Sequence, residues 1–268
     1  MNIGLIITPV VVLAIMGFVF AFLLGIVSEK FYVEVDLKQK KVREVLPGAN
    51  CGACGYPGCD GCAAAIANKE APASACVIGG ADVAAKVAEA IGEVADFSQE
   101  KKLALVKCNG DCNNSVEKFH YEGIKDCRAM ISYFGGSKAC SYGCLGCGSC
   151  VDACEFDAIH IKNNIAVVDR NKCVACGACV KICPKNIIEL VPESMNYAVL
   201  CMSQDKGKDV RSNCKVGCIG CRICSKTYPE AFEINSNLSK ETGIENPDMS
   251  LIDEAINKCP MNSIHKLN

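Results

Sequence analysis

The chain has 268 residues, of which 23 are Cys and 3 are His, and it contains no Trp. Its 28 basic and 30 acidic side chains give a formal net charge of −2, which argues against a nucleic-acid-binding protein that depends on bulk positive charge. A high cysteine content is typical of short, disulfide-linked secreted chains, but this chain is too long for that class. Its length suits about two domains. Its cysteines lie in Cys-x-x-Cys runs, which converge on a metal or an iron–sulfur cluster more readily than on each other.

Residues 1–27 are expected to form a transmembrane anchor. Ile3 to Val27 carries no charged residue, and such a helix would be roughly 37 Å long, enough for the ~30 Å hydrocarbon core of a bilayer. Pro9 lies in the first third of this segment, where a helix tolerates it best. The alternative is a cleaved signal peptide, but no Lys or Arg precedes the apolar run and no small-x-small cleavage site precedes Glu29.

The charges around the span predict its orientation. Met1 and Asn2 bring no side-chain charge, whereas the span is followed by Lys30, Lys38, Lys40, Lys41 and Arg43. The positive-inside rule then places the C-terminal body in the cytoplasm, where thiolates stay reduced. A single span without an internal charge is no ion path by itself, so we expect an anchor or a docking helix for other membrane subunits.

A charged juxtamembrane linker is expected over 28–46, ending at Pro47-Gly48, and a four-cysteine domain over 47–96 with short helices at 60–69 and 81–95. The spacing C-x2-C-x4-C-x16-C gives the ligands Cys51, Cys54, Cys59 and Cys76. Zinc sites usually use two separated Cys-x-x-Cys pairs, so three clustered cysteines plus a distant fourth favour [4Fe–4S] over a zinc knuckle. Cys62 fits no ligand position, and we expect it to be a small buried apolar residue.

Residues 97–142 form a further cysteine-bearing region. Its cysteines give the hypothesis of one more cluster, held by Cys108, Cys112, Cys127 and Cys140. A repeat leaves this pairing open, because Cys127-x12-Cys140-x3-Cys144 has the same spacing as Cys201-x12-Cys214-x3-Cys218. Cys201 and Cys214 have no second pair beside them, so they are either stray buried thiols or a sign that the first set is paired wrongly.

The region 143–192 has the pattern of a two-cluster bacterial ferredoxin, with two C-x2-C-x2-C-x3-C runs. In that pattern the fourth cysteine of each run crosses to the other cluster. One cluster would be held by Cys144, Cys147, Cys150 and Cys183. The second would be held by Cys154, Cys173, Cys176 and Cys179. Residues 158–168 alternate around Asn163-Asn164 and predict a hairpin between the runs.

The region 193–268 repeats this pattern with losses. Tyr228-Pro229 stands where the fourth cysteine and its proline are expected, and the second run has lost its triplet. These two changes belong together, since a missing second cluster needs neither a triplet nor a crossing cysteine. We therefore expect a degenerate one-cluster module with the ligands Cys218, Cys221, Cys224 and Cys259.

The expected fold is α+β: a single N-terminal transmembrane helix, a small helical Fe–S domain, then bacterial-ferredoxin-like (βαβ-type) Fe–S modules. The clusters number about five. We find no Gly-x-Gly-x-x-Gly that opens a helix after a strand, no Walker loop and no defensible Ser/His/Asp arrangement, so we expect no NAD or flavin site and no catalytic residues in this chain. Such a chain would relay electrons between a donor and an acceptor on other chains.

The apolar span, the ferredoxin runs and the segment 46–59 together resemble the B-subunit family of the Rnf complex (RnfB). The segment reads Leu-Pro-Gly-Ala-Asn-Cys-Gly-Ala-Cys-Gly-Tyr-Pro-Gly-Cys. The cysteines of 97–142 and 191–268 are similar to the longer form found in anaerobic bacteria. The resemblance implies an electron-relay subunit of an ion-translocating ferredoxin:NAD⁺ oxidoreductase in the bacterial cytoplasmic membrane.

The resemblance also implies which partners the chain would have. Soluble ferredoxin would reduce the clusters at 144–183 or 218–259, and the cluster at 51–76 would pass electrons to membrane subunits that move Na⁺ or H⁺. NAD and most flavins would belong to partner subunits, and no nucleic acid is expected. The alternatives are a polyferredoxin subunit of a hydrogenase or another oxidoreductase, and a zinc-binding scaffold.

A docking hypothesis concerns the basic residues Lys206, Lys208, Arg211 and Lys215, which lie just before a cysteine triplet. Ferredoxins are commonly acidic, so a basic face would suit them as partners. The alternative is a solvated loop.

Overall fold

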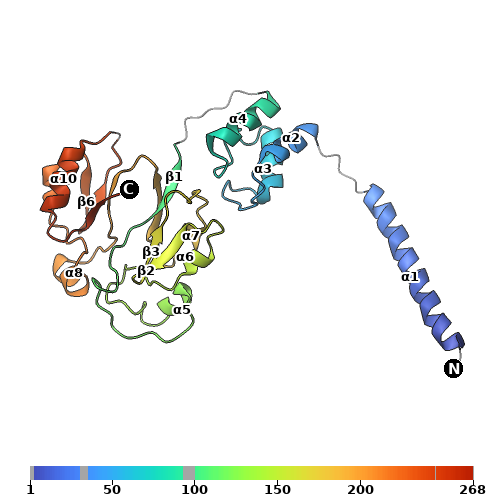
Figure 1. The fold of residues 1–268 in the computed structure, drawn as a ribbon, viewed down its shortest axis with the longest axis horizontal. Helices are drawn as coiled ribbons and strands as arrows, with labels where there is room; N and C mark the ends of the chain where they lie inside the picture. Colours follow the sequence, from blue (N-terminus) through green and yellow to red (C-terminus); the bar gives the residue numbers. More distant parts are fainter. Residues whose placement is uncertain (1–2, 31–35, 93–99, 245, 268) are drawn as a thin grey trace.

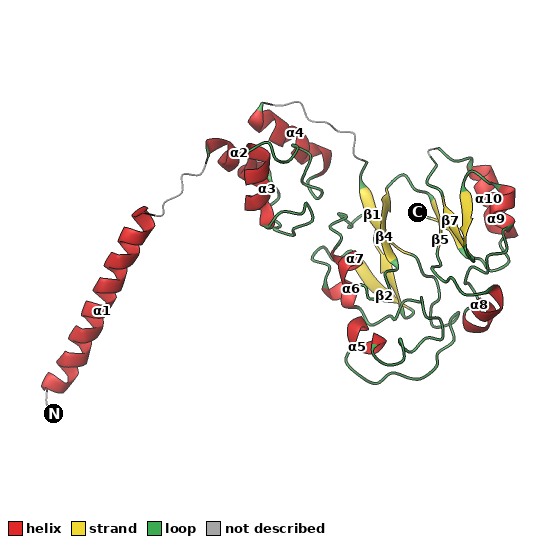
Figure 2. Cartoon of the chain, turned by 180° about the vertical axis from the view of Figure 1, so that it is seen from behind, coloured by secondary structure: helices red, strands yellow, loops and turns green. Residues whose placement is uncertain are grey.

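The protein is described by a computed structural model that covers residues 3–30, 36–92, 100–244 and 246–267. Along the chain these residues form a long helix, a small helical unit and a larger body that contains all the strands described (Figure 1). The helical unit lies between the long helix and the body in both ribbon views (Figures 1 and 2).

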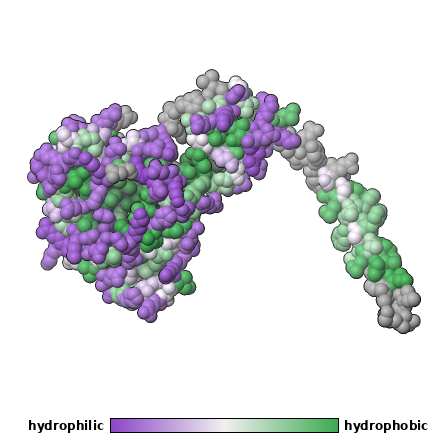
Figure 3. Space-filling model, viewed as in Figure 1, coloured by the Kyte–Doolittle hydropathy of each residue, from purple (hydrophilic) through white to green (hydrophobic). Residues whose placement is uncertain are grey.

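The N-terminal helix α1 spans Ile3–Lys30 and is apolar all round. Its segment Val10–Ser28 has a mean hydropathy of 3.0 and is not buried against any other part of the chain. Large side chains such as Phe18 and Leu24 are 73% and 67% exposed, and the face of this helix that is seen in Figure 3 is mostly hydrophobic. By length and composition α1 can cross a membrane, as predicted.

The helical unit consists of α2 (Leu37–Val45), α3 (Gly58–Ala67) and α4 (Gly80–Ile91). These helices enclose a small core made of residues such as Val42 and Val87, both fully buried. The helices expected at 60–69 and 81–95 correspond to α3 and α4. Residues 93–95 of the second helix, the boundary expected at 96–97 and residues 31–35 of the expected linker lie outside the described residues.

The body contains four two-stranded sheets, and every strand pair is antiparallel. The pairs are β1 (Lys102–Val106) with β4 (Ile188–Pro192), β2 (Ile159–Lys162) with β3 (Ile165–Val168), β5 (Tyr197–Val199) with β8 (Ile264–Lys266), and β6 (Phe232–Asn235) with β7 (Leu238–Glu241). The βαβ-type arrangement expected from the sequence is therefore wrong for the described residues, because a βαβ unit pairs its strands in parallel.

Instead, two modules repeat one plan, in which an outer strand pair encloses a hairpin. The first module runs from β1 to β4 around the hairpin β2–β3, and the second from β5 to β8 around β6–β7. The predicted hairpin over 158–168 is confirmed: Asn163 and Asn164 have φ of 49° and 65°, the left-handed values that a tight two-residue turn requires. Strand β1 falls in the region 97–142 yet pairs with β4, so this strand and the two-cluster pattern share one sheet.

A short helix in each case carries the third cysteine of a triplet: α6 (Ser149–Asp152), α7 (Ala178–Ile182) and α9 (Ile223–Thr227). The remaining helices are α5 (Cys127–Ile131), α8 (Gly207–Asn213) and α10 (Met249–Lys258). Each module has its own apolar core, and cysteines are part of both cores. The fold therefore places thiol groups where an ordinary small domain would place only aliphatic side chains.

Candidate iron–sulfur sites

The helical unit brings all the cysteines of 51–76 around one hollow of about 290 Å³. Besides the four expected ligands, Cys62 of α3 lines the same hollow and is also part of the apolar core. The loop that carries the first three cysteines turns tightly through Gly52, Gly55 and Gly58, all with positive φ. Asn50 Oδ1 accepts the N–H of Cys59 at 2.8 Å, which ties the start of this loop to the start of α3.

The first hollow of the two-cluster module, about 340 Å³, is lined by Cys144, Cys150 and Cys183. Cys183 lies in the second run, so the structure brings a cysteine of the second run beside Cys144 and Cys150 of the first. Cys147 stands beside this hollow, with its Sγ 3.7 Å from Met130 Sδ, while Cys127 of α5 contributes to the lining. Five thiols thus gather where a cluster needs four.

The second hollow of this module, about 310 Å³, is lined by Cys154, Cys173, Cys176 and Cys179, the complete expected set. Backbone N–H groups point at two of its sulfurs: Ala104 donates to Cys173 Sγ at 3.3 Å and Ala158 donates to Cys154 Sγ at 3.4 Å. Such N–H···S bonds stabilise the negative charge of cluster sulfur and help to set the reduction potential.

The third hollow of the body, about 340 Å³, belongs to the second module and is lined by Cys218, Cys221, Cys224 and Cys259. Ser239 donates its N–H to Cys218 Sγ at 3.5 Å, and Ser263 donates its N–H to Cys259 Sγ at 3.5 Å. Tyr228, which takes the place of a fourth cysteine in the run, is buried in the apolar core of this module. The structure thus brings together the four cysteines that the sequence assigned to this module.

A fourth hollow of the body, about 490 Å³, is lined by Cys108, Cys140, Cys201 and Cys214. The structure does not bring the expected set Cys108/Cys112/Cys127/Cys140 together. Cys112 is exposed, and Cys127 faces the hollow of Cys144 and Cys183. The reason is topological: this hollow lies where the two modules meet, so it groups two cysteines of the first module with two cysteines of the second.

Several of the thiols are buried in apolar surroundings, which disfavours their charged form. Burial raises the pKa of Cys150 and of Cys201 to about 12, and that of Cys179 to about 11. Cysteine binds metal only as the thiolate, so cluster assembly at these positions must displace protons. Bound iron would supply the positive charge that the protein alone does not bring to these sulfurs.

The sulfurs stand around hollows and do not meet at a point. Among the described residues, no three His, Cys, Asp or Glu side chains are grouped as a single metal ion would require. A structural zinc holds its ligand atoms within about 2.3 Å of one centre, whereas a cluster spreads its thiolates over four iron atoms. Four thiols spread around a hollow are an arrangement that a [4Fe–4S] cluster can use.

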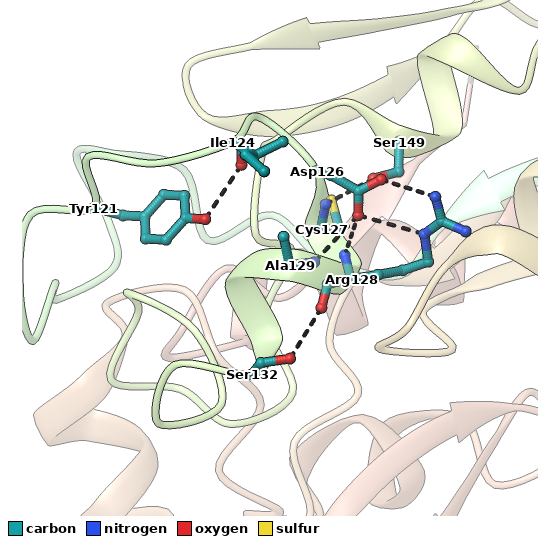
Figure 4. A network of polar contacts seen from close by, with 8 residues as sticks. All are labelled: Tyr121, Ile124, Asp126, Cys127, Arg128, Ala129, Ser132 and Ser149. Atoms are coloured by element: carbon teal, nitrogen blue, oxygen red, sulfur yellow. Dashed lines mark hydrogen bonds and ion pairs between the residues drawn. The ribbon is translucent and has the colours of Figure 1, made fainter.

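A polar network fixes helix α5 beside the first hollow of the two-cluster module (Figure 4). Asp126 caps the helix, accepting the N–H of Arg128 at 2.6 Å and of Ala129 at 3.2 Å. The Arg128 side chain bonds the same carboxyl, which lowers the pKa of Asp126 to about 2. Cys127 donates its N–H to Ser149 Oγ at 2.7 Å, which ties α5 to α6. Cys127 is thus held against the hollow by its backbone.

Two features of the candidate sites escaped the sequence reasoning. Cys201 and Cys214 remained unassigned, although each lies in a module position that matches Cys108 or Cys140. Arg222 is an exposed residue with φ of 64°, at the position after the second cysteine of its triplet. Gly148 and Gly177 occupy that position in the other two triplets, and the comparison of these three positions could have singled out Arg222.

An apolar N-terminal helix followed by hollows of clustered thiols in ferredoxin-like modules defines the class: an anchored iron–sulfur electron carrier. Family models match three stretches of the chain. They are described as "Putative Fe-S cluster" (residues 46–78), "4Fe-4S dicluster domain" (143–187) and "4Fe-4S single cluster domain of Ferredoxin I" (215–266). The last two agree with two clusters in the first module and one in the second.

The relatives narrow this class to one family. The chain is 43% identical over 261 residues to the B subunit of the Na(+)-translocating ferredoxin:NAD(+) oxidoreductase complex of Acetobacterium woodii, a match that covers 97% of this chain and 77% of that protein. It is 38% identical over 227 residues to the B subunit of the ion-translocating oxidoreductase complex of Methanosarcina acetivorans, covering 84% of this chain and 86% of that protein. It is 41% identical over 232 residues to the B subunit of the proton-translocating ferredoxin:NAD(+) oxidoreductase complex of Clostridium ljungdahlii. This match covers 85% of this chain and 81% of that protein.

The chain therefore belongs to the family of B subunits of ion-translocating oxidoreductase complexes, the Rnf B subunits. It is an electron-relay subunit of a membrane-bound oxidoreductase, and the resemblance read from the sequence is confirmed.

Proposed function

We propose that this subunit receives electrons from reduced soluble ferredoxin and passes them toward NAD⁺ through a membrane complex that moves Na⁺ or H⁺. The observation that carries the proposal is the series of thiol-lined hollows that runs from one end of the body to the helical unit. NAD and flavin would bind to partner subunits, and the cysteine-rich body would lie on the cytoplasmic side of the bacterial membrane, where ferredoxin is found.

Four ligand sets belong to this proposal, each for one [4Fe–4S] cluster. They are Cys51/Cys54/Cys59/Cys76, Cys144/Cys147/Cys150/Cys183, Cys154/Cys173/Cys176/Cys179 and Cys218/Cys221/Cys224/Cys259. When bound, the clusters would supply one-electron chemistry. The chain's own residues hold the thiolates apart, direct backbone N–H groups at several of them and leave most of them buried or half-buried.

Electrons are proposed to enter at the second module, because Cys221 is exposed there and its neighbour Arg222 is exposed too. Four exposed basic residues lie on and around α8: Lys206, Lys208, Arg211 and Lys215. Together they offer positive charge to an acidic partner, although Asp209 on α8 is exposed as well. Such charges act mainly on the rate of encounter.

Electrons are proposed to leave through the helical unit. The exposed thiol of Cys51 lies close enough to Cys176 to contribute to the raised pKa of Cys176, after the larger effect of burial. The cluster at 154–179 would therefore be the neighbour of the cluster at 51–76. Helix α1 follows the helical unit toward the N-terminus and would keep this exit near the membrane subunits.

The decisive experiment is iron and sulfide analysis of the anaerobically purified chain, combined with EPR after reduction. We expect about 16 to 20 Fe per chain and [4Fe–4S] signals that reduced ferredoxin can generate. A colourless protein that holds zinc would refute the cluster assignment. Clusters that dithionite reduces but no ferredoxin does would instead refute the choice of electron donor.

Charge reversal tests the docking face separately. The variant with Lys206, Lys208 and Arg211 changed to Glu should slow ferredoxin-driven reduction at low salt and flatten its dependence on ionic strength, because long-range attraction is lost. Stopped-flow measurement at several salt concentrations gives both quantities, with Lys38→Glu on α2 of the helical unit as control. An unchanged rate at low salt would contradict the proposed face.

A further inference from the structure

The four cysteines Cys108, Cys140, Cys201 and Cys214 of the fourth hollow lie outside every stretch that matches a cluster family, although Cys214 falls one residue before the last match. Two of these cysteines come from the first module and two from the second. Each pair occupies matched positions, which makes this hollow the meeting point of the two modules.

The first matched pair is Cys108 and Cys201. Cys108 stands two residues after the end of β1, and Cys201 stands two residues after the end of β5. The residue between strand and cysteine is fixed in the same way in both modules: Lys107 donates its N–H to Ile187 O at 2.7 Å, and Leu200 donates its N–H to Ser263 O at 2.8 Å. The segments also bond each other, since Asn109 donates its N–H to Leu200 O at 3.2 Å.

The second matched pair is Cys140 and Cys214, each four residues before the first cysteine of a triplet. The backbone folds alike around both sulfurs. Cys140 accepts hydrogen bonds from the backbone of Tyr142 and Gly143, and Cys214 accepts them from Val216 and Gly217, the residues two and three places further on. Backbone N–H groups aimed at a sulfur are what a cluster ligand uses to stabilise its charge.

The close approach of the chain to this hollow depends on a glycine. A Cβ at Gly110 would lie 3.3 Å from Cys214 Sγ and 3.8 Å from Cys108 Sγ. Gly110 therefore lets one backbone segment run past two sulfurs from different modules.

The hollow also has a buried positive charge beside it. Lys138 is 1% exposed, and its Nζ donates to the carbonyl oxygens of Gly110 at 2.7 Å and Asn164 at 3.0 Å. Both acceptors are neutral, and a buried ammonium without a countercharge is expensive. Lys138 acts electrostatically on Cys214 and on Cys144, so an anionic group in the hollow would supply the missing countercharge.

We infer that Cys108, Cys140, Cys201 and Cys214 hold a fifth [4Fe–4S] cluster, which joins the two ferredoxin-like modules into one path. The inference rests on the proposed relay function for its direction of flow. One electron would enter this cluster from the cluster at 218–259 and leave it for the cluster at 144–183, with no bond made or broken.

Hydrogen bonds connect the inferred cluster to both neighbours. Cys144 donates its N–H to Cys108 Sγ at 3.4 Å, and Cys201 accepts the matching bond from the backbone of Cys218. Cys144 and Cys218 are each the first cysteine of a neighbouring triplet. A ligand of the inferred cluster is thus one hydrogen bond away from a ligand of each adjacent cluster.

The test is the iron content of full-length, anaerobically purified holoprotein carrying Cys201→Ala or Cys214→Ala, with Cys112→Ala as the matched control. The parent should hold about 20 Fe per chain, each test variant about 16, and the control as much as the parent. The EPR signals of the other clusters should persist in the test variants. In single-turnover experiments, ferredoxin should still reduce the cluster at 218–259, while reduction of the remaining clusters slows.

Three results would overturn the inference: about 16 Fe in the parent, which needs no variant to fold; unchanged iron in Cys201→Ala and Cys214→Ala; or zinc at this site. Loss of iron in Cys112→Ala would instead support the rival set Cys108/Cys112/Cys127/Cys140. Serine variants at the same two positions serve where an alanine variant does not accumulate. None of these outcomes depends on the electron donor, so failure of the ferredoxin assay alone would leave the fifth cluster standing and refute only the proposed function.

Discussion

The two modules of the body share one plan but use it differently. The first encloses two hollows, and cysteines make up a large part of its core. The second encloses one hollow of its own, and where the other triplet would stand it has α10 and an aromatic core. Tyr197 and Phe232 meet there edge to face at 5.4 Å between ring centroids, and the Tyr228 hydroxyl accepts the N–H of Asp248 at 3.3 Å. The difference shows that apolar packing can replace a cluster as the centre of such a module.

The largest expected effect comes from removing a cluster from the second module. Cys259→Ala should eliminate about 4 Fe per chain and nearly abolish reduction by ferredoxin, because this module holds the cluster proposed to accept the first electron. Cys183→Ala should lose as much iron, yet the cluster at 218–259 should still accept electrons. Iron analysis with stopped-flow reduction compares the two variants. Equal loss of the first reduction phase in both would contradict the second module as the point where electrons enter.

The next largest expected effect is a difference between the two modules in how well they remain folded after iron is removed. After anaerobic chelation, the backbone amides of β6, β7 and α10 should keep more protection from hydrogen exchange than residues 169–183, because the second module retains an aromatic core. Hydrogen exchange followed by mass spectrometry measures both regions in one sample. Simultaneous loss of protection in the two modules would show that the aromatic core does not replace a cluster.

Shortening a large side chain of the aromatic core tests directly how much this core contributes to the stability of the second module. Phe232 is fully buried, so Phe232→Ala should lower the free energy of unfolding of the second module by about 3–5 kcal/mol. Phe134, 88% exposed, is the matched control, and its alanine variant should change that free energy by less than about 0.5 kcal/mol. Denaturant unfolding monitored by circular dichroism measures the free energy of unfolding of both variants. A small loss for Phe232→Ala would mean that clusters, not the aromatic core, hold the module together.

The smallest expected effect is at Arg222. A non-glycine residue with positive φ is strained by about 1 kcal/mol, so Arg222→Gly should leave stability unchanged or slightly raised. Reduction by ferredoxin should slow because positive charge beside Cys221 is lost. Arg222→Lys should retain most of the rate. If the glycine variant were reduced as fast as the parent, Arg222 would have no part in docking.

The sequence predicted the sites that depend on spacing within a run. The crossing of Cys154 and Cys183 follows from the position of each in its run, and Cys259 could be assigned because Tyr228 breaks the pattern upstream. The structure groups these cysteines as the sequence suggested. The hairpin at Asn163-Asn164 was predictable for a similar reason, since a two-residue turn has a strong local signal.

The hollow between the modules was not predictable in this way. Cys108 and Cys201 are matched by their distance from β1 and β5, but β1 and β5 are strands of five and three residues with little periodic signal. The intervening segments also differ greatly in length, covering residues 109–139 with α5 in one module and 202–213 with α8 in the other. The equal spacing from Cys127 and from Cys201 to the next cysteine therefore aligned Cys201 with Cys127, whereas in the structure Cys108 takes the position that matches Cys201. The antiparallel pairing of β1 with β4 is likewise a long-range choice that no local pattern reveals.

The exposure of Cys221 has a practical consequence for work with this protein. A cluster that a soluble protein can approach is also open to oxygen, while most of the other cluster thiols are buried or half-buried. Brief exposure to air should therefore damage the cluster at 218–259 early, before most of the brown colour is lost. A preparation could then look well loaded with iron and still fail to accept electrons, so colour is a poor guide to its competence.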